Sequence, residues 1–182
     1  MLILILGVAL WGLTHSIKRT APGFRARLGE TRAKLFVTGT TIVSIGLMIV
    51  GYRIAQPVEI YDLGPDTIYL NNLMMVIALA LMFASTTRSH LVELLRHPMN
   101  TGFILFCLAH LFISGDIRSI LLFGGLGIWA ILSIILNNIA EPDWDRPSGT
   151  LVGDAILLTI VVALTIGIGW LHTRAGLQPF GA

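Results

Sequence analysis

The chain has 182 residues, of which 55% are apolar and only 12% are charged. Its mean hydropathy of +0.84 is far above the value that a water-soluble domain of this length tolerates. The composition therefore excludes a soluble globular enzyme and predicts a membrane protein. The formal net charge of +2 adds little, because the positions of the charges matter more than their sum.

Six stretches of 17 to 21 residues contain no Asp, Glu, Lys or Arg. A helix of 18 residues covers about 27 Å, which is close to the hydrocarbon thickness of roughly 30 Å. A membrane β-barrel would need short strands of alternating polarity, and the apolar stretches do not alternate. We therefore expect an all-α fold, a polytopic transmembrane helical bundle that forms one membrane domain over residues 1–182. Its expected spans are 1–17, 35–52, 67–87, 99–115, 119–136 and 155–171.

Basic residues are concentrated in the segment 18–34, which holds six of the twelve Lys and Arg residues. Cytoplasmic loops of membrane proteins carry such an excess. If this segment is cytoplasmic, nine basic residues lie inside and three outside, and both termini lie outside. The lipid bilayer, including its anionic lipids, is then the expected partner of the segment. Nucleic acid is not an expected partner, because so apolar a chain has too few basic residues.

Two histidines fall within the predicted spans, His15 and His110. A charged imidazole is costly in hydrocarbon, so such a histidine is either neutral and hydrogen-bonded or bound to something. Helical spacing places Cys107 and Phe103 on the face of His110, and Trp11 one turn before His15. An apolar slot with aromatic walls and two neutral imidazoles would suit an iron porphyrin. A packed interface in which the histidines bond to backbone carbonyls fits the same residues equally well.

The predicted spans place the two histidines at different depths. At 1.5 Å per residue, His15 and His110 are offset by about 13 Å along the membrane normal. Two imidazoles on one iron have Cβ atoms roughly 12 Å apart, so the pair is at the limit of reach. His15 and His97 share a level more naturally, which makes His97 a candidate substitute ligand.

Four segments in a fixed order resemble one known family. They are the His15–Ser16 pair followed by APGFRARLGE, LLRHPMNTGF around His97, CLAHLFISGD around His110, and LLFGGLGIWA in the fifth span. In this order they resemble the NnrU family of bacterial membrane proteins, from the first span through the fifth. That family is associated with denitrification gene clusters and nitrogen-oxide metabolism. The resemblance implies a multi-pass protein of the bacterial inner (cytoplasmic) membrane.

The NnrU family is in turn similar to 15-cis-zeta-carotene isomerase, a membrane enzyme that contains haem b. This similarity implies haem b as cofactor, with His15 and His110 as ligands of the iron and Cys107 as a redox-responsive thiol beside it. It also implies redox-gated isomerisation or electron transfer on a lipophilic substrate. An open iron position would suit nitric oxide. The region after Asn137, which contains EPDWDRPSG and the sixth span, departs from the core pattern of these proteins.

A second resemblance involves RHPMNTG at residues 96–102. This segment is similar to a motif of isoprenylcysteine and phospholipid methyltransferases, where it lies beside the S-adenosylmethionine site. The acidic pair and the aromatic tail of those enzymes are not found downstream. We favour a helix start, because proline is well tolerated in the first turn and Arg96 suits the membrane interface.

Three hypotheses therefore remain: a haem-b-binding protein, a cofactor-free membrane assembly or interaction factor, and a membrane methyltransferase. No catalytic residue can be assigned from the sequence. Small residues let membrane helices approach closely, and two spans present them in a form that would allow a homo-oligomer. These residues are Gly124, Gly125 and Gly127 in the fifth span and Gly167 and Gly169 in the sixth.

Overall fold

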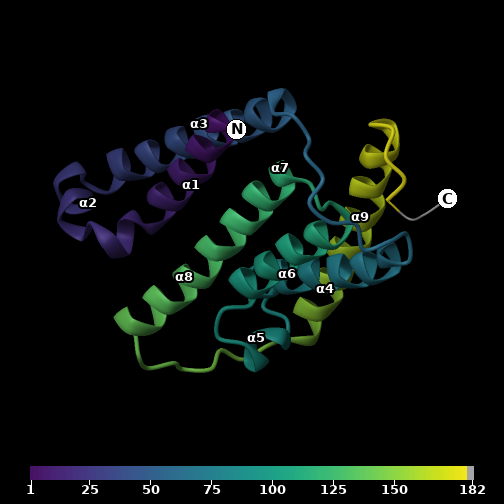
Figure 1. Ribbon diagram of the computed structural model, residues 1–182. Coiled ribbons are helices and arrows are strands. Elements are labelled where there is room, and N and C mark those ends of the chain that lie inside the picture. Colours follow the sequence, from purple (N-terminus) through teal and green to yellow (C-terminus); the bar gives the residue numbers. More distant parts are fainter. Residues whose placement is uncertain (180–182) are drawn as a thin grey trace.

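The computed structural model describes residues 1–179, and these fold into helices joined by short connections (Figure 1). Short helices lie at some of the connections between the long ones. In chain order they are α1 (Leu2–Thr20), α2 (Pro22–Leu28), α3 (Glu30–Ile54), α4 (Thr67–Thr87), α5 (Leu91–Leu94), α6 (Pro98–Ile113), α7 (Ile117–Ser119), the π-helix η1 (Ile120–Gly124), α8 (Gly125–Ala140) and α9 (Leu151–Arg174).

Each of the six predicted spans corresponds to one helix or one continuous helical run. Five are long and apolar enough to cross a membrane: α1, α3, α4, the run Ile117–Ala140 and α9. The remaining helix, α6, corresponds to the predicted span 99–115; it is apolar but has only 16 residues. The prediction of an all-α membrane bundle is confirmed, although several helices extend past the predicted limits. The second span, expected at 35–52, is part of a helix of 25 residues.

The basic segment 18–34, which we expected to be a loop, is mostly helical. Helix α1 continues to Thr20, and α2 begins at Pro22, a residue that suits the first turn of a helix. Gly29 has a φ of 73°, a left-handed conformation that glycine adopts without steric cost, and α3 begins directly after it. The basic side chains are therefore carried by three consecutive helices.

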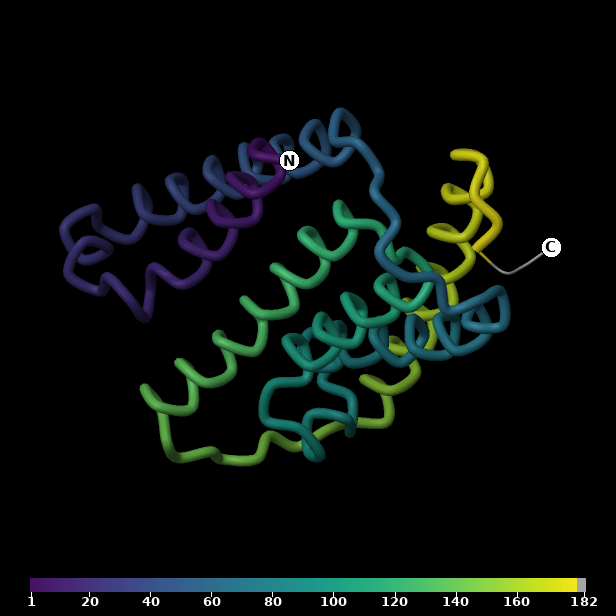
Figure 2. The backbone as a smooth tube through the Cα atoms, in the orientation of Figure 1, coloured from purple at the N-terminus to yellow at the C-terminus, as the bar shows by residue number. Residues whose placement is uncertain are grey.

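The helices form two groups with α8 between them (Figures 1 and 2). Helices α1 and α3 pack as a hairpin, and α4 packs against both α6 and α9. Helix α8 contacts α1 on one side and α6 on the other. Leu4, Met48, Cys107 and Leu126 form a buried cluster that joins these groups.

Two glycines show how close the helix pairs are. A Cβ on Gly51 of α3 would overlap the backbone nitrogen of Leu4, and one on Gly102 of α6 would lie 2.6 Å from the carbonyl oxygen of Ala78. Small residues allow such close backbone approaches. A Cβ on Gly124 or Gly167 would have no atom within 4 Å, whereas one on Gly125 would lie 2.7 Å from Val8 of α1, so Gly125 is used inside the bundle. The homo-oligomer stays a prediction.

The connections gather at two opposite ends of the bundle, as an up-and-down arrangement requires (Figure 1). At the end that carries α2, α5 and the α8–α9 connection, which we call the α5 end, Arg19 Nε donates to Asn137 Oδ1 at 2.9 Å. At the opposite end, the α7 end, the Ile60 N–H donates to the Gly115 carbonyl at 2.9 Å. The connections lie alternately at the two ends, which matches the predicted topology. The assignment of the α5 end to the cytoplasm stays a prediction.

The outer surface of the bundle is apolar. Leu13, Ile42 and Leu158 are 72%, 65% and 66% exposed, and many other large apolar side chains are also accessible. Exposed apolar area on this scale indicates a surface that faces lipid or another protein. Together with the length of the helices, it supports a location in a membrane.

Candidate functional site

Seven aromatic and imidazole rings meet where α1, α6 and the η1–α8 run come together. The rings contact one another in a continuous set, which we call the aromatic–histidine cluster. Its members are Trp11, His15, Phe103, Phe106, His110, Phe123 and Trp129.

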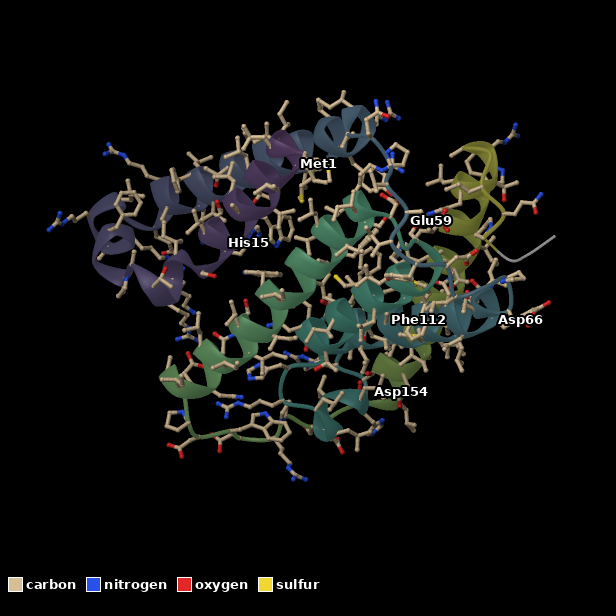
Figure 3. All side chains as sticks on the ribbon, viewed as in Figure 1. Met1, His15, Glu59, Asp66, Phe112 and Asp154 are labelled. Atoms are coloured by element: carbon tan, nitrogen blue, oxygen red, sulfur yellow. The ribbon has the colours of Figure 1, made fainter. Side chains whose placement is uncertain are left out.

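Both predicted site histidines belong to this cluster. The imidazole of His15 stacks on Trp11 with ring centroids 4.1 Å apart and meets Trp129 at 5.5 Å. On the side of α1 where His15 meets Trp129, this helix faces α8 (Figure 3). The imidazole of His110 stacks on Phe123 at 4.4 Å, and Phe106 lies 4.3 Å away.

The two imidazoles make the same local hydrogen bond. His15 Nδ1 donates to the Trp11 carbonyl at 2.9 Å, and His110 Nδ1 donates to the Phe106 carbonyl at 2.9 Å. With Nδ1 protonated, Nε2 carries the lone pair of a neutral imidazole. Metal-binding histidines commonly show this arrangement, in which one ring nitrogen donates to a carbonyl and the other faces the metal. In their neutral form the two imidazoles therefore each present an Nε2 lone pair, which could bind a metal, in an apolar region.

The cluster does not bring the two histidines into contact with each other. Their ring partners Trp129 and Phe123 are six residues apart on one helical run, which corresponds to about 9 Å along the axis. Among the described residues, the ring contacts that connect the histidines run from His15 through Trp11 or Trp129 to Phe103 and then through Phe106 to His110.

Comparison with protein families gives one match. The model of the NnrU protein family matches residues 3–179, nearly the whole chain. The chain belongs to the NnrU family. No curated protein and no solved structure gives a significant match. The family match also includes the region after Asn137 and helix α9. This region therefore belongs to the pattern of the NnrU family, although we expected it to depart from the core pattern.

Two buried indole N–H groups in this NnrU protein have no hydrogen-bond partner among the described residues: Trp11 Nε1 and Trp129 Nε1. The two indole rings meet edge to face, with centroids 5.6 Å apart and planes at 89°. An indole edge can donate weakly to an aromatic face, but a buried donor normally finds a full acceptor. Two such donors beside His15 therefore fit a site that receives an acceptor group.

Sequence reasoning did not single out Trp129, Phe106 or Phe123 as site residues. Their position in the cluster depends on which face of α6 and of the η1–α8 run meets α1. The apolar pattern of these helices does not specify that face. The one available signal was the aromatic content of the segments that also carry the family resemblance.

Cys107 lies next to the aromatic–histidine cluster and is only 1% exposed. It belongs to the buried group that also contains Leu4, Met48 and Leu126, and it is one helical turn before His110. The predicted position of the thiol near the second histidine is therefore observed. Its predicted response to redox conditions stays a prediction.

His97 lies outside the cluster, at the α5 end. Its Nε2 is 2.9 Å from Asn138 Oδ1, so this nitrogen already has a partner. Arg96 donates to the carbonyls of Glu141, Pro142 and Asp143, and Pro98 is the first residue of α6. The helix-start interpretation of this motif is confirmed, since α6 begins at Pro98 directly after His97.

A further ionic contact joins α1 to the end of α8. Arg19 Nη2 lies 2.6 Å from Glu141 Oε1, and this bond lowers the pKa of the Glu141 carboxyl below its usual value. The α5 end is therefore held together by arginines that bond to the segment after α8, while the aromatic–histidine cluster lies deeper in the bundle.

The residue types of the cluster are ones that haem sites use. Histidine nitrogens are common axial ligands of haem iron and apolar side chains surround the ring, and the cluster has two Nε2 atoms and five aromatic side chains. Within residues 1–179, no group of three or more His, Cys, Asp or Glu side chains is placed to hold a metal ion.

Proposed function

We propose that this NnrU protein binds haem b in the aromatic–histidine cluster, with His15 and His110 as the axial nitrogen donors. The observation that carries the proposal is the shared hydrogen bond of the two imidazoles, which in the neutral ring leaves the lone pair on Nε2. The nearest partner of His15 Nε2 is Thr41 Oγ1 at 3.5 Å, a weak contact. No hydrogen bond to His110 Nε2 occurs among the described residues.

The aromatic side chains determine how a haem could be held. The rings of Phe103 and Phe106 lie between the two histidines in the series of ring contacts. One haem bound by both histidines therefore requires these rings to turn aside. Ligation by His110 alone does not require Phe103 to move, because among the described aromatic rings His110 contacts Phe106 and Phe123.

When bound, haem b would supply a redox-active iron, suited to electron transfer, to redox-gated isomerisation of a lipophilic substrate, or to binding of nitric oxide in nitrogen-oxide metabolism. The protein's own residues would orient and shield this group. The carbonyls of Trp11 and Phe106 fix the orientation of the two imidazoles. The aromatic rings exclude water, and the apolar outer surface gives a lipophilic substrate access from the bilayer.

The visible absorption spectrum of the purified protein tests the proposal. The protein is produced in cells supplied with a haem precursor and measured in mild detergent, oxidised and reduced. We expect a sharp Soret band, with split α and β bands on reduction if both histidines bind the iron. His110→Ala should abolish the Soret band, and His15→Ala should change its position from that of a six-coordinate to that of a five-coordinate species.

His172 provides a matched control. Its Nδ1 donates to the Ile168 carbonyl at 2.8 Å, the same local bond, but its ring is not part of the cluster. His172→Ala and His97→Ala should both leave the spectrum unchanged. A folded protein that stays colourless after haem addition would overturn the proposal, and an unchanged spectrum in His110→Ala would remove this residue from the ligands.

A cofactor-free assembly or interaction factor is the second candidate function. The observation in its favour is that the seven rings contact one another directly, so that they also serve as a packed interface between α1, α6 and α8. This function predicts a colourless protein that tolerates His15→Ala and co-purifies with defined membrane partners. The methyltransferase hypothesis gains no support, because Arg96 and His97 are engaged in the helix start; S-adenosylmethionine binding to the folded protein would revive it.

A further inference from the structure

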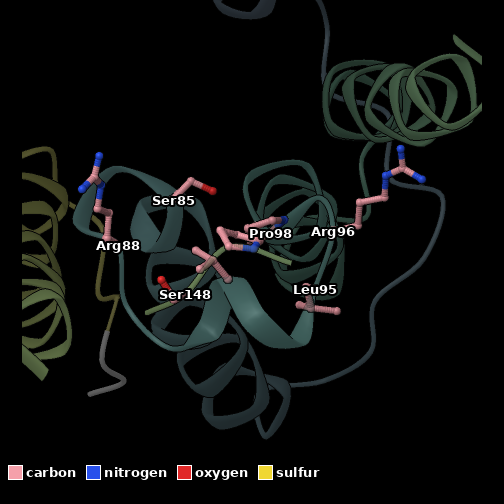
Figure 4. Close-up of a pocket in the computed structure, with 8 residues that line it drawn as sticks. Ser85, Arg88, Leu95, Arg96, Pro98 and Ser148 are labelled. Carbon is pink, nitrogen blue, oxygen red and sulfur yellow. The ribbon is translucent and has the colours of Figure 1, made fainter. Parts of the chain in front are cut away.

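A second site lies at the α5 end, away from the aromatic–histidine cluster. A cavity of about 460 Å³ opens where α4 ends, α5 turns and α6 begins (Figure 4). Ligand sites in proteins commonly have volumes of about 300 to 1,000 Å³. The lining of the cavity combines two arginines with two hydroxyls and apolar side chains: Arg88, Arg96, Ser85, Ser148, Leu95 and Pro98.

We propose that this cavity binds a phosphate-bearing anion, and that the membrane supplies it as the headgroup of an anionic phospholipid. Guanidinium groups are the preferred protein partners of phosphate, and serine hydroxyls can donate further hydrogen bonds. The proposal is independent of haem, because none of these residues belongs to the cluster.

The charge balance of the cavity favours an anion. Arg96 donates only to backbone carbonyls, and the Arg88 guanidinium makes no hydrogen bond or ion pair within residues 1–179. The nearby carboxylates are already engaged: Glu93 accepts the Gly149 N–H at 2.7 Å, and Asp154 accepts from His90. The Arg88 guanidinium therefore lines the cavity without a carboxylate partner, and Arg96 adds a second positive charge whose nearest acidic neighbour is Glu141, outside the lining.

The backbone of Arg88 supplies an independent argument. Arg88 ends α4 with φ 57° and ψ 42°, and among the described residues it is the only non-glycine residue with a positive φ. Glycine is the usual residue at this position, because a side chain makes the left-handed conformation costly. The backbone is held there because the Arg88 carbonyl accepts the Thr150 N–H at 2.9 Å. Arginine in place of glycine suggests that its side chain has a use.

The position of the cavity in the bundle explains why a lipid is the favoured source. The C-terminal end of one long apolar helix and the first turn of another border it, so it lies at the level where the apolar spans end. Leu95 and Pro98 offer apolar surface beside the arginines. A phospholipid combines a phosphate with an apolar glycerol ester region, and arginine clusters at helix ends are typical binding sites for anionic headgroups.

The test uses the substitution Arg88→Gly, which removes the guanidinium and relieves the left-handed strain, so folding is retained. The full-length protein in detergent is titrated with phosphatidylglycerol, and bound lipid is counted by native mass spectrometry. We expect one tightly bound lipid in the wild type and about tenfold to a hundredfold weaker binding in Arg88→Gly, the size expected for one charge-assisted hydrogen bond. Arg88→Lys should retain most of the affinity.

The matched control is Arg146→Gly, which removes one arginine from the same end but outside the cavity, where Arg146 stacks on Trp144. This variant should bind phosphatidylglycerol as the wild type does. Equal binding by Arg88→Gly and wild type, or equal weakening in Arg88→Gly and Arg146→Gly, would overturn the proposal. The second result would show general attraction to a basic surface.

Two further titrations identify the source of the phosphate. Phosphatidylcholine, whose headgroup carries no net charge, should bind more weakly than phosphatidylglycerol if an anionic lipid is the ligand. Inorganic phosphate and glycerol 3-phosphate should displace the lipid only at high concentration. If they instead saturate the site with Arg88-dependent affinity and displace the lipid readily, the cavity takes a soluble phosphate, and the assignment to a lipid is wrong.

Discussion

His90 and Asp154 are joined by two hydrogen bonds that connect the end of α4 to the first turn of α9. His90 Nδ1 lies 2.5 Å from Asp154 Oδ2, and the His90 backbone N–H donates to Asp154 Oδ1 at 2.9 Å. Figure 3 shows Asp154 at this end of α9. Both side chains are nearly half exposed. The pair therefore contributes to the packing of α9 against α4 in a way that depends on protonation.

The first prediction concerns the pH dependence of stability. The hydrogen bond to Asp154 raises the pKa of His90 above 6.5; burial opposes this effect and the charges of Asp154 and Glu93 add to it. A raised pKa in the folded state gives stability that is complete below about pH 6.5 and is lost as the pH rises through the folded pKa. The melting temperature in detergent should therefore be slightly lower at about pH 8.5 than at about pH 6.

Asp154→Asn should remove most of this difference, and Asp143→Asn, which changes an acidic residue outside the pair, should retain it. An unchanged pH dependence in Asp154→Asn would mean that another group is responsible. The expected effect is modest, because ion pairs open to solvent contribute little.

The second prediction concerns the contact between α1 and α3. Gly51→Ala would place a Cβ against the backbone of Leu4, and we expect a loss of about 1 to 3 kcal/mol in the free energy of unfolding. Gly46, in the same helix, has no atom within 4 Å of the position that a Cβ would take, so Gly46→Ala should raise stability by about 0.5 to 1 kcal/mol. Denaturation in mixed detergent micelles measures both changes. A tolerated Gly51→Ala would contradict the close packing of this hairpin.

The helices could be predicted from the sequence because hydropathy adds up over a whole span. Six apolar stretches sufficed to place six helices, since nothing polar interrupts them. The partners of each helix could not be predicted. Close helix contacts occur at Gly51 and Gly102, which the sequence did not single out, whereas Gly124 and Gly167, which it did, have open space where a Cβ would lie. In a helix that is apolar all round, composition does not indicate which face meets a neighbour.

The candidate site was partly predictable for the same reason. His15 and His110 stood out because imidazoles are rare in apolar spans, and both lie in one cluster. Their partners Trp129 and Phe123 could not be deduced, because these contacts depend on α8 lying between α1 and α6. The helicity of residues 22–28 was also missed, since a charged segment of seven residues has no apolar periodicity of its own.

The third prediction concerns Tyr61, which connects the α3–α4 segment to the end of α6. The Tyr61 hydroxyl donates to the Leu111 carbonyl at 2.6 Å, a carbonyl in the last turn of α6 that has no helical partner. Tyr61→Phe should lower the free energy of unfolding by about 1 to 2 kcal/mol, since it leaves a partly buried acceptor without a donor. Tyr69, which is 71% exposed, provides the control: Tyr69→Phe should have no measurable effect. Equal melting temperatures for the two variants would show that the Tyr61 bond adds nothing.

The last prediction concerns the thiol of Cys107, the one cysteine of the chain. Because Cys107 is only 1% exposed and packs among Leu4, Met48 and Leu126, a thiol reagent can reach it only when the bundle opens. Maleimide labelling of the folded protein should be at least about tenfold slower than labelling of the denatured protein. Ser148→Cys in a Cys107→Ala background places a thiol on the exposed α8–α9 connection, and it should react rapidly under the same conditions. Fast labelling of native Cys107 would show that the core beneath the cluster opens readily, as a thiol that responds to cellular redox conditions requires. Slow labelling would instead assign Cys107 a packing role below the two histidines.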